Sequence, residues 1–306
     1  MTSLPLLRVN VFPGGFNWPI FVAQENGYFA REGIAVQLQA TTGSVAQMTD
    51  FAAGRCDIVM TAFDNIVAYV EGTGEAPIGA QPEFFAFLGS DDSFLSLASA
   101  PDISAIADLR GRSVSVDAAT TGYAFVLFDL LARAGLKQGD YTVAKVGGMK
   151  QRFEDLCRSG HAATMLSAPY DILAQQNGLR VLAALSEPYQ GNVAAARRSW
   201  AAENADQIAA YVRAYVSALI WLHNPVHCDD AAVTLERNTA MEPELASASC
   251  ARMLTANGGF SRTGNIDAEG AQNVLRLRSR YGPTGQLLSD PAKYADMRFW
   301  AQAMEG

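Results

Sequence analysis

The sequence predicts an α/β protein made of two lobes. Strand and helix patterns alternate through the first half of the chain, which is typical of βα units that build a parallel sheet. Around residues 84–88 and 94–98 the pattern becomes extended and then starts again, which indicates a crossing into a second lobe. The 306 residues with 49% apolar content also favour two cores over one, because single cores tend to stop growing at about 250–300 residues.

Three strands and three helices are expected at the start of the first lobe. A turn at residues 13–15 separates the first strand from the first helix. Gly27 stops that helix, since glycine is the usual residue just past a helix end. The next helix carries Val45, Met48 and Phe51 at helical spacing. The expected strands are residues 6–11, 34–40 and 57–61, and the expected helices are residues 18–26, 44–54 and 65–71.

The second lobe repeats this order of elements. Residues 120–123 open its first helix, which carries Phe125 on its apolar face and stops at Gly135. The chain then crosses back near residues 181–192, and it is mostly helical from Ala205 onward. The other expected elements are strands at residues 113–116, 141–146 and 164–167 and helices at residues 150–158 and 170–176.

Two segments of the chain resemble each other. Residues 54–65 align without gaps with residues 160–171, and in both a helix ends at glycine before a short buried strand runs into Thr/Ser-Ala. Any two βα units share part of this pattern, so a generic likeness is one explanation. The shared Thr/Ser-Ala-x-x-Asp/Asn ending is more than generic units require, and it favours a repeated structural role.

Composition and charge exclude some classes of function. The formal net charge is −8 and no basic run is longer than Arg197-Arg198, so we expect no nucleic-acid partner. The most apolar stretch, residues 210–222, contains Arg213 and is far shorter than the roughly 20 residues that span a bilayer. Residues 1–5 show no basic start and no cleavage site. We therefore expect either a cytoplasmic protein or a periplasmic one whose leader has been removed.

Neither a metal nor a cofactor is expected. The four cysteines form no C-x-x-C pair, which argues against structural zinc. Cys228 and Cys250 lie near the outer ends of two helices that would form a hairpin, so a disulfide between them is possible in an oxidising compartment. His223 and His227 have the spacing of a metal pair, but Pro225 breaks the helix that this spacing needs. No P-loop, dinucleotide fingerprint or nucleophile elbow is present.

Candidate binding residues gather where predicted strands turn into helices. Ligands of open α/β sheets bind beyond the carboxyl ends of the strands, where helix starts offer unpaired N–H groups to an anionic or polar ligand. Ordinary helix capping by Ser, Thr and Asp is the alternative for each turn. The candidate ligand-binding residues are Asn17, Trp18, Thr42, Gly43, Ser44, Thr61, Phe63, Asp64, Asn65, Asp117, Thr120, Thr121, Gly122, Tyr123, Ser167 and Tyr170.

Four of these residues have specific expected roles. Trp18 could stack on a flat ligand, and Phe63 and Tyr170 could form aromatic walls on opposite lobes. Packing in the core is the alternative for all three rings. Asp64 could accept a hydrogen bond from a ligand amine or ring N–H, or it could cap the helix that follows.

Motifs along most of the chain carry a family resemblance. They are residues 17–19, 22–29, 32–34, 51–57, 108–112, 200–214 and 221–225. In this order they resemble the solute-binding proteins of ABC importers that take up sulfonates, taurine, nitrate and thiamine-pyrimidine precursors. The resemblance implies a type II periplasmic-binding-protein fold, in which two α/β lobes are joined by two hinge crossings and the ligand cleft lies between them. It further implies a first lobe of residues 1–90 plus 190–306 and a second lobe of residues 91–189.

The resemblance also implies a function and its alternatives. The expected function is non-catalytic: a monomer closes on a small polar solute and then meets a membrane permease. From Trp18, Phe63 and Tyr170 and the hydroxyl-rich helix starts, we expect the solute to be flat or heteroaromatic, or to carry a sulfonate or carboxylate. Enzymes occur in the same family, but residues 12–20 lack the cysteine of the sulfinate-cleaving lyase. A cytoplasmic lyase or decarboxylase with its base among Asp64, His161 and Asp117 remains the alternative, as does a ligand sensor.

Overall fold

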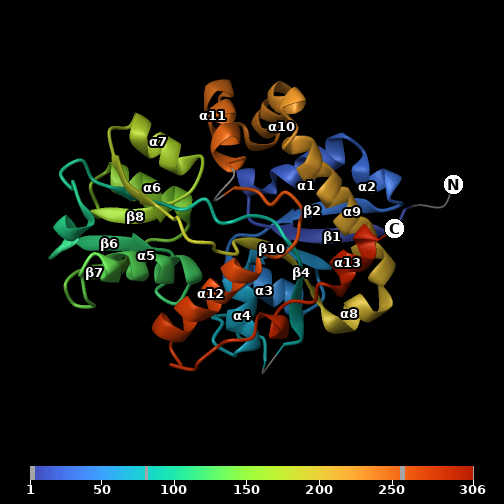
Figure 1. The fold of residues 1–306 in the computed structure, drawn as a ribbon, viewed down its shortest axis with the longest axis horizontal. Coiled ribbons are helices and arrows are strands. Elements are labelled where there is room, and N and C mark those ends of the chain that lie inside the picture. Colours follow the sequence, from blue (N-terminus) through green and yellow to red (C-terminus); the bar gives the residue numbers. More distant parts are fainter. Residues whose placement is uncertain (1–3, 80–81, 256–258, 306) are drawn as a thin grey trace.

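The computed structural model describes residues 4–79, 82–255 and 259–305, and it consists of two lobes that lie side by side (Figure 1). The first lobe contains a five-stranded sheet of order β2-β1-β3-β10-β4. Its strands are β1 (Leu6–Val11), β2 (Ala35–Ala40), β3 (Ile58–Ala62), β4 (Phe84–Gly89) and β10 (Asn192–Arg197). All strands of this sheet therefore come from residues 6–89 and 192–197.

The second lobe contains a sheet of order β7-β6-β8-β5-β9, which matches the order of the first sheet position by position. Its strands are β5 (Ser96–Ser99), β6 (Ser113–Val116), β7 (Thr142–Lys145), β8 (Ala163–Leu166) and β9 (Arg180–Ala184). The two similar sequence segments contain β3 and β8, which both occupy the third place in their sheets. The sequence likeness thus reflects equivalent positions in two similar lobes.

The expectation of parallel sheets is wrong for one strand in each lobe. β10 runs antiparallel to β3 and β4, and β5 runs antiparallel to β8 and β9. These are the strands that follow the two crossings, so each enters its sheet from the edge that faces the other lobe. The parallel pairs are those within βα units, namely β1 with β2 and β3, and β6 with β7 and β8.

Helices cover both sheets. The helices of the first half are α1 (Trp18–Glu25), α2 (Tyr28–Arg31), α3 (Ser44–Ala52), α4 (Phe63–Val70), α5 (Gly122–Arg133), α6 (Met149–Cys157) and α7 (Tyr170–Gln176). Those of the second half are α8 (Arg198–Glu203), α9 (Ala205–Leu222), α10 (Cys228–Thr239), α11 (Pro243–Met253), α12 (Ala268–Tyr281) and α13 (Arg298–Met304). One buried cluster joins α1 and α9 to the first sheet, and a second extends from α3 and α4 into the second lobe.

Asp91 holds the two crossings against each other. The first crossing connects β4 to β5 and the second connects β9 to β10. Gly191 donates its N–H to the carbonyl oxygen of Asp91 over 2.8 Å. The Asp91 carboxylate accepts from both the backbone and the side chain of Asn192, over 3.2 and 2.9 Å. The hinge is therefore a pair of bonded segments rather than two independent linkers.

Membrane-spanning helices and metal-binding side-chain clusters are both absent from residues 4–79, 82–255 and 259–305. No helix among these residues is long and apolar enough to cross a membrane. The same residues contain no group of three or more His, Cys, Asp or Glu side chains placed to hold a metal ion. Cys228 is exposed, Cys250 is buried, and both thiols are free. Burial, with a smaller effect of Cys228, raises the pKa of the Cys250 thiol to about 12.

Candidate functional site

The carboxyl ends of the strands in the two lobes point toward each other. β4 runs in the same direction as β1 and β3, and the chain leaves its carboxyl end directly into the second lobe. On the other side, Ser96 at the start of β5 pairs with Leu166 at the end of β8. Both sheets therefore present to the junction the edge at which α/β proteins bind ligands.

The starts of α4 and α5 are in close contact across this junction. A Cβ atom placed on Gly122 would lie 2.4 Å from the hydroxyl oxygen of Tyr189 and 2.7 Å from Cβ of Asp64. Distances below 3.0 Å are essentially never adopted by real Cβ atoms, so only glycine fits at this position. The structure thus brings together Asp64 and Gly122, two predicted site residues from different lobes.

The predicted turns of the first lobe form a small polar group. The Asn65 side-chain amide donates to Oγ of Ser44 over 3.1 Å and to Oγ1 of Thr61 over 2.9 Å. Thr42 is exposed and Gly43 is half-buried at the start of α3. The structure thus brings together Ser44, Thr61 and Asn65, from the end of β3 and the starts of α3 and α4. Their mutual hydrogen bonds are also what ordinary stabilisation of the helix starts would produce.

Asp64 is fully engaged by an arginine from the C-terminal part of the chain. Its two carboxylate oxygens accept from Nε and Nη2 of Arg278, each over 2.6 Å. Both side chains are only 4% exposed. Both carboxylate oxygens of Asp64 are thus already bonded within the protein rather than open to a ligand N–H. No sequence pattern pointed to Arg278 as its partner.

The predicted turn of the second lobe is internally bonded and also reaches the first lobe. Thr121 donates through its hydroxyl to Oδ1 of Asp117 over 2.8 Å. Thr120 donates to Oε1 of Glu75 in the first lobe over 3.1 Å. Burial, followed by the charge of Asp91, raises the pKa of Tyr123. Tyr123 therefore stays a neutral hydroxyl close to the crossings.

Ser167 and Tyr170 lie at the start of α7. The Ser167 hydroxyl is 3.0 Å from the sulfur of Met149, at the start of α6. The half-buried Tyr170 ring packs on Phe153, with 5.6 Å between the ring centroids. The Tyr170 ring is thus partly accessible and remains a candidate aromatic wall.

Two predicted aromatic contacts lie in the core. Trp18 is 0% exposed, and its indole N–H donates to the carbonyl oxygen of Ala231 over 2.9 Å. Phe63 is also fully buried and meets Tyr294 edge to face. Neither ring has a face open to a ligand in this structure. Both rings are packed in the core, which was the alternative expected for them.

Asn17 is buried and is oriented by its own loop. Its side-chain nitrogen donates to the carbonyl oxygens of Phe12 and Gly14, over 2.6 and 3.3 Å. These bonds fix the direction of the amide, because only the nitrogen can donate. The side-chain oxygen of Asn17 is buried without a protein partner. Of the residues in the first loop, Asn17 is thus the stronger candidate for ligand contact.

Other buried polar atoms near the facing edges also lack partners. Within the described residues these atoms are Oδ1 of Asn10, Oε1 of Gln47, and the hydroxyl oxygens of Ser93, Ser115 and Tyr189. Gln47 is oriented like Asn17, since its nitrogen donates to Met60 O over 3.1 Å and to Asn10 O over 3.4 Å. A buried polar group without a partner costs about 1–3 kcal/mol. Each such atom therefore indicates a place where a ligand or water would bind.

Arg152 is a buried cation in the second lobe. It is 3% exposed, and its guanidinium donates to Met165 O over 2.8 Å, Gly147 O over 3.1 Å and Thr164 Oγ1 over 3.2 Å. Among residues 4–79, 82–255 and 259–305, no carboxylate forms an ion pair with it, although Asp117 is a nearby charge. Burial lowers the pKa of Arg152.

Arg152 is not among the predicted site residues because of its place in the fold. It lies on the first half of α6, whereas the predicted residues lie in and near the strand-to-helix turns. An arginine on the face of α6 that covers the sheet is unusual, because arginine is almost never fully buried unless it is paired. Placing Arg152 on that face from the helical spacing could have identified it.

A cavity of about 280 Å³ lies between the crossings and residues 260–267. None of the predicted site residues lines it. Two of its acidic residues already have protein partners: Glu187 pairs with Arg133, and Asp267 caps α12 by accepting from the backbone N–H of Gly270. The cavity therefore lies apart from the predicted site residues.

Three solved structures illustrate what the fold resembles. The periplasmic nitrate-binding protein NrtA from Synechocystis PCC 6803 is 13% identical, with a TM-score of 0.81 over 99% of this chain and 89% of that chain. The periplasmic aliphatic sulphonate binding protein SsuA from Escherichia coli is 15% identical, with a TM-score of 0.73 over 97% of both chains. The desulfurization enzyme DSZB is 14% identical, with a TM-score of 0.69 over 98% of this chain and 99% of that chain.

The structural likenesses establish the two-lobed periplasmic-binding-protein fold. A search of curated proteins found no sequence match. The sequence model of one family, described as NMT1/THI5 like, matches residues 17–227. That match covers well over half of the 306 residues, and the chain belongs to this NMT1/THI5-like family.

Proposed function

We propose that this protein is the solute-binding component of an ABC importer and closes on a small polar solute between its two lobes. Family membership and the resemblance to nitrate- and sulphonate-binding proteins support a binding role. A membrane permease is the partner that this role implies. A periplasmic location and a monomeric state belong to the same proposal.

The observation that carries the proposal is the set of unpartnered polar atoms at the facing edges. In the first lobe these atoms are acceptors, the amide oxygens of Asn10, Asn17 and Gln47. Near the crossings and in the second lobe they are hydroxyl groups, those of Ser93, Ser115 and Tyr189. Such a division suits a solute that donates hydrogen bonds toward the first lobe and accepts them from the second.

Arg152 supplies the charge on the second-lobe side. A buried guanidinium without a carboxylate partner is stabilised by an anion, and hydrogen bonds to charged groups contribute about 1.5–3 kcal/mol. We therefore place a sulfonate, carboxylate or comparable acidic group of the solute beside Arg152. A ring or amine N–H of the same solute would then reach Asn17 and Gln47.

Calorimetry with the Arg152→Gln variant tests this assignment. The probes are nitrate, an alkanesulfonate, taurine and an aminopyrimidine carboxylate. Wild-type protein should bind at least one probe, and Arg152→Gln should weaken that binding by at least about tenfold, the equivalent of about 1.4 kcal/mol. Arg180→Gln is the matched control, because Arg180 is an exposed arginine in the same lobe whose side chain donates to Pro101 O. Equal affinities for all three proteins would reject the assignment.

An enzyme on the same fold is the second candidate, because one structural relative is a desulfurization enzyme. Of the three candidate bases, Asp64 is paired with Arg278, and His161 is paired with Asp155 of α6. Only Asp117 remains at the junction, where it accepts from Thr121. Turnover of a bound probe that is lost in Asp117→Asn would favour the enzyme, and a probe recovered unchanged would favour the binding protein.

A further inference from the structure

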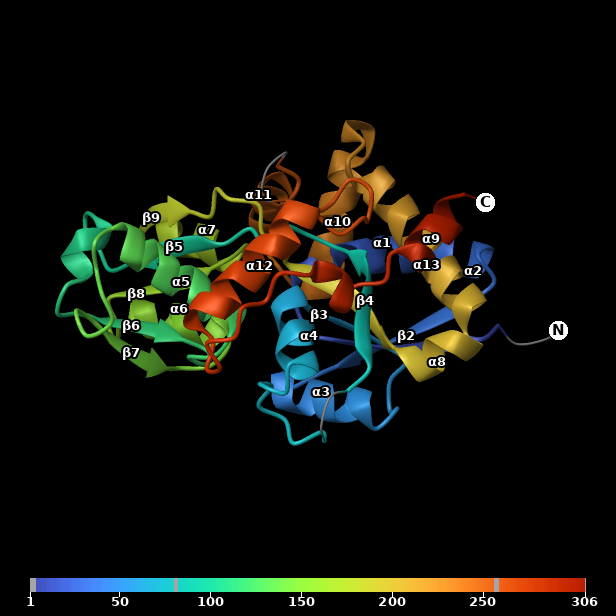
Figure 2. The same cartoon turned by 60° about the horizontal axis from the view of Figure 1, so that its bottom comes forward.

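Helix α12 lies across the junction of the two lobes. It packs on α4 of the first lobe and on α5 of the second, and both views show it alongside the hinge rather than within either sheet (Figures 1 and 2). Its side chains Val274, Leu275 and Leu277 are buried in one apolar cluster. That cluster also contains Phe63 from the first lobe and Phe125 from the second. α12 thus joins the apolar interiors of both lobes.

Both ends of α12 are anchored outside the second lobe. Before the helix, the backbone N–H of Asp267 donates to the Gln190 side chain in the second crossing over 2.8 Å. After the helix, Ala86 in β4 donates its N–H to the carbonyl oxygen of Tyr294 over 2.8 Å. The chain therefore leaves the hinge, passes over α5, and returns to the first lobe.

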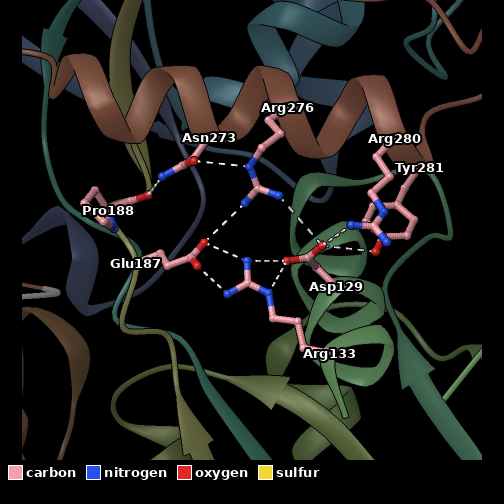
Figure 3. A network of polar contacts seen from close by, with 8 residues as sticks. All are labelled: Asp129, Arg133, Glu187, Pro188, Asn273, Arg276, Arg280 and Tyr281. Carbon is pink, nitrogen blue, oxygen red and sulfur yellow. Dashed lines mark hydrogen bonds and ion pairs between the residues drawn. The ribbon is translucent and has the colours of Figure 1, made fainter. Parts of the chain in front are cut away.

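A charged network binds α12 to the second lobe (Figure 3). The buried carboxylate of Asp129 on α5 accepts from the Tyr281 hydroxyl over 3.1 Å and pairs with Arg280 over 3.5 Å. Arg276 pairs with Glu187 of the second crossing over 3.2 Å. Arg133 of α5 contacts both Asp129 and Glu187, so all of these groups act as one network.

Arg278 provides the connection to the first lobe. It forms the buried two-bond pair with Asp64 and donates to Oγ1 of Thr73 over 3.1 Å, both in the first lobe. The same guanidinium donates to the carbonyl oxygen of Thr120 over 3.1 Å and lies 5.1 Å from the Phe125 ring centroid, both in the second lobe. One side chain therefore contacts both lobes where they meet.

From this geometry we infer that α12 is a strap that holds the two lobes together without ligand, with Arg278, oriented by Asp64, as its latch. Because both ends of α12 are anchored outside the second lobe, opening would leave Arg278 paired with Asp64 and would break its contacts with Thr120 and Phe125. Opening would also break the ion pairs of Arg276 and Arg280, so the closed arrangement is favoured before any solute binds. This inference rests on the proposed function only in assuming that the lobes can open.

Two native thiols allow the inference to be tested without engineering labelling sites. Cys157 at the end of α6 and Cys228 at the start of α10 are exposed, whereas Cys56 and Cys250 are buried. Nitroxide labels on Cys157 and Cys228 report the separation of the lobes by pulsed electron resonance. Ligand-free wild-type protein should show one narrow distance distribution.

Asp64→Asn removes the carboxylate that holds Arg278 against the carbonyl oxygen of Thr120. The open-to-closed ratio should rise by at least about tenfold, which would appear as a second, longer distance. Arg276→Gln/Arg280→Gln weakens the exposed part of the network and should give a smaller increase of about two- to tenfold. This double variant keeps the test valid if Asp64→Asn does not fold. Arg112→Gln, which removes an exposed ion pair within the second lobe, should leave the distribution unchanged.

A broad or long distance in ligand-free wild-type protein would overturn the strap. A distance distribution that stays the same in every folded variant of Asp64, Arg276 and Arg280 would overturn it as well. Because all of these measurements are made without ligand, they stand apart from the calorimetry. If wild-type protein binds none of the probes, the proposed function fails while the strap is still judged on its own result.

Discussion

Asp91 shows how one buried residue can set a pH dependence for the hinge. Burial raises the pKa of its carboxyl group, against the opposing effect of hydrogen bonds from Asn192 and Ser93. No basic side chain among the described residues forms an ion pair with it. The ionised Asp91 carboxylate is therefore stabilised by hydrogen bonds without a basic partner, including the two from Asn192 that join the crossings.

The first prediction concerns the pH dependence of stability at Asp91. A folded-state pKa above the unfolded value of about 3.9 means that the folded protein binds the proton more tightly. This contribution to stability is complete below about pH 3.9 and is lost as pH rises through the raised value. Asp91→Asn should abolish that loss. Urea unfolding of both proteins at several pH values between about 4 and 7 measures it, and a pH-independent difference would contradict the account.

For single residues, the sequence predicted where a side chain lies better than it predicted which atoms that side chain contacts. The turns containing Ser44, Thr61 and Asn65 lie together as expected. The role of Trp18 could not be read from its neighbours in sequence, because its indole bonds to Ala231, more than 200 residues away. Arg278 was missed for the same reason, since its partner Asp64 lies equally far along the chain.

At the scale of elements, Trp18 fixes α1 against α10. Its ring lies 6.2 Å from that of Phe260, and its N–H satisfies a carbonyl oxygen within α10. Trp18→Phe keeps most of the apolar contact but leaves the Ala231 carbonyl without this donor. The free energy of unfolding should fall by about 1–3 kcal/mol. Trp300→Phe is the matched control, because Trp300 donates to Thr263 O in an exposed bond, and its loss should cost less than about 1 kcal/mol. Equal losses in urea unfolding would count against this role.

The start of α5 gives a second prediction at this scale. Because a Cβ on Gly122 would lie within 2.7 Å of atoms from Tyr189 and Asp64, Gly122→Ala should push the two helix starts apart. We expect ligand affinity to fall by at least about tenfold while the circular dichroism spectrum is kept. Calorimetry with the best probe measures the change, and an unchanged affinity would show that the close approach is not needed for binding.

Element order was predictable because hydrophobic periodicity and glycine stops act locally. Strand direction was not, since it depends on where the chain re-enters a sheet. β5 and β10 follow crossings and therefore run against their neighbours. The position of α12 across both lobes was equally beyond local patterns, because its buried face is shared between two cores.

At the scale of the whole molecule, two lobes of matching strand order face each other with the carboxyl ends of their parallel strands. Two bonded crossings and one helix connect them. The proposed site combines polar atoms from both lobes, so neither lobe alone would hold the solute. We propose that a small solute binds at this junction and leaves it chemically unchanged.

Native mass spectrometry of the intact protein with the four probes tests that claim most directly. We predict a 1:1 complex with at least one probe, loss of that complex in Arg152→Gln but not in Arg180→Gln, and release of the probe at its original mass after denaturation. A complex that forms equally well with Arg152→Gln would contradict the proposed site, and a released molecule of altered mass would contradict a binding protein without catalysis.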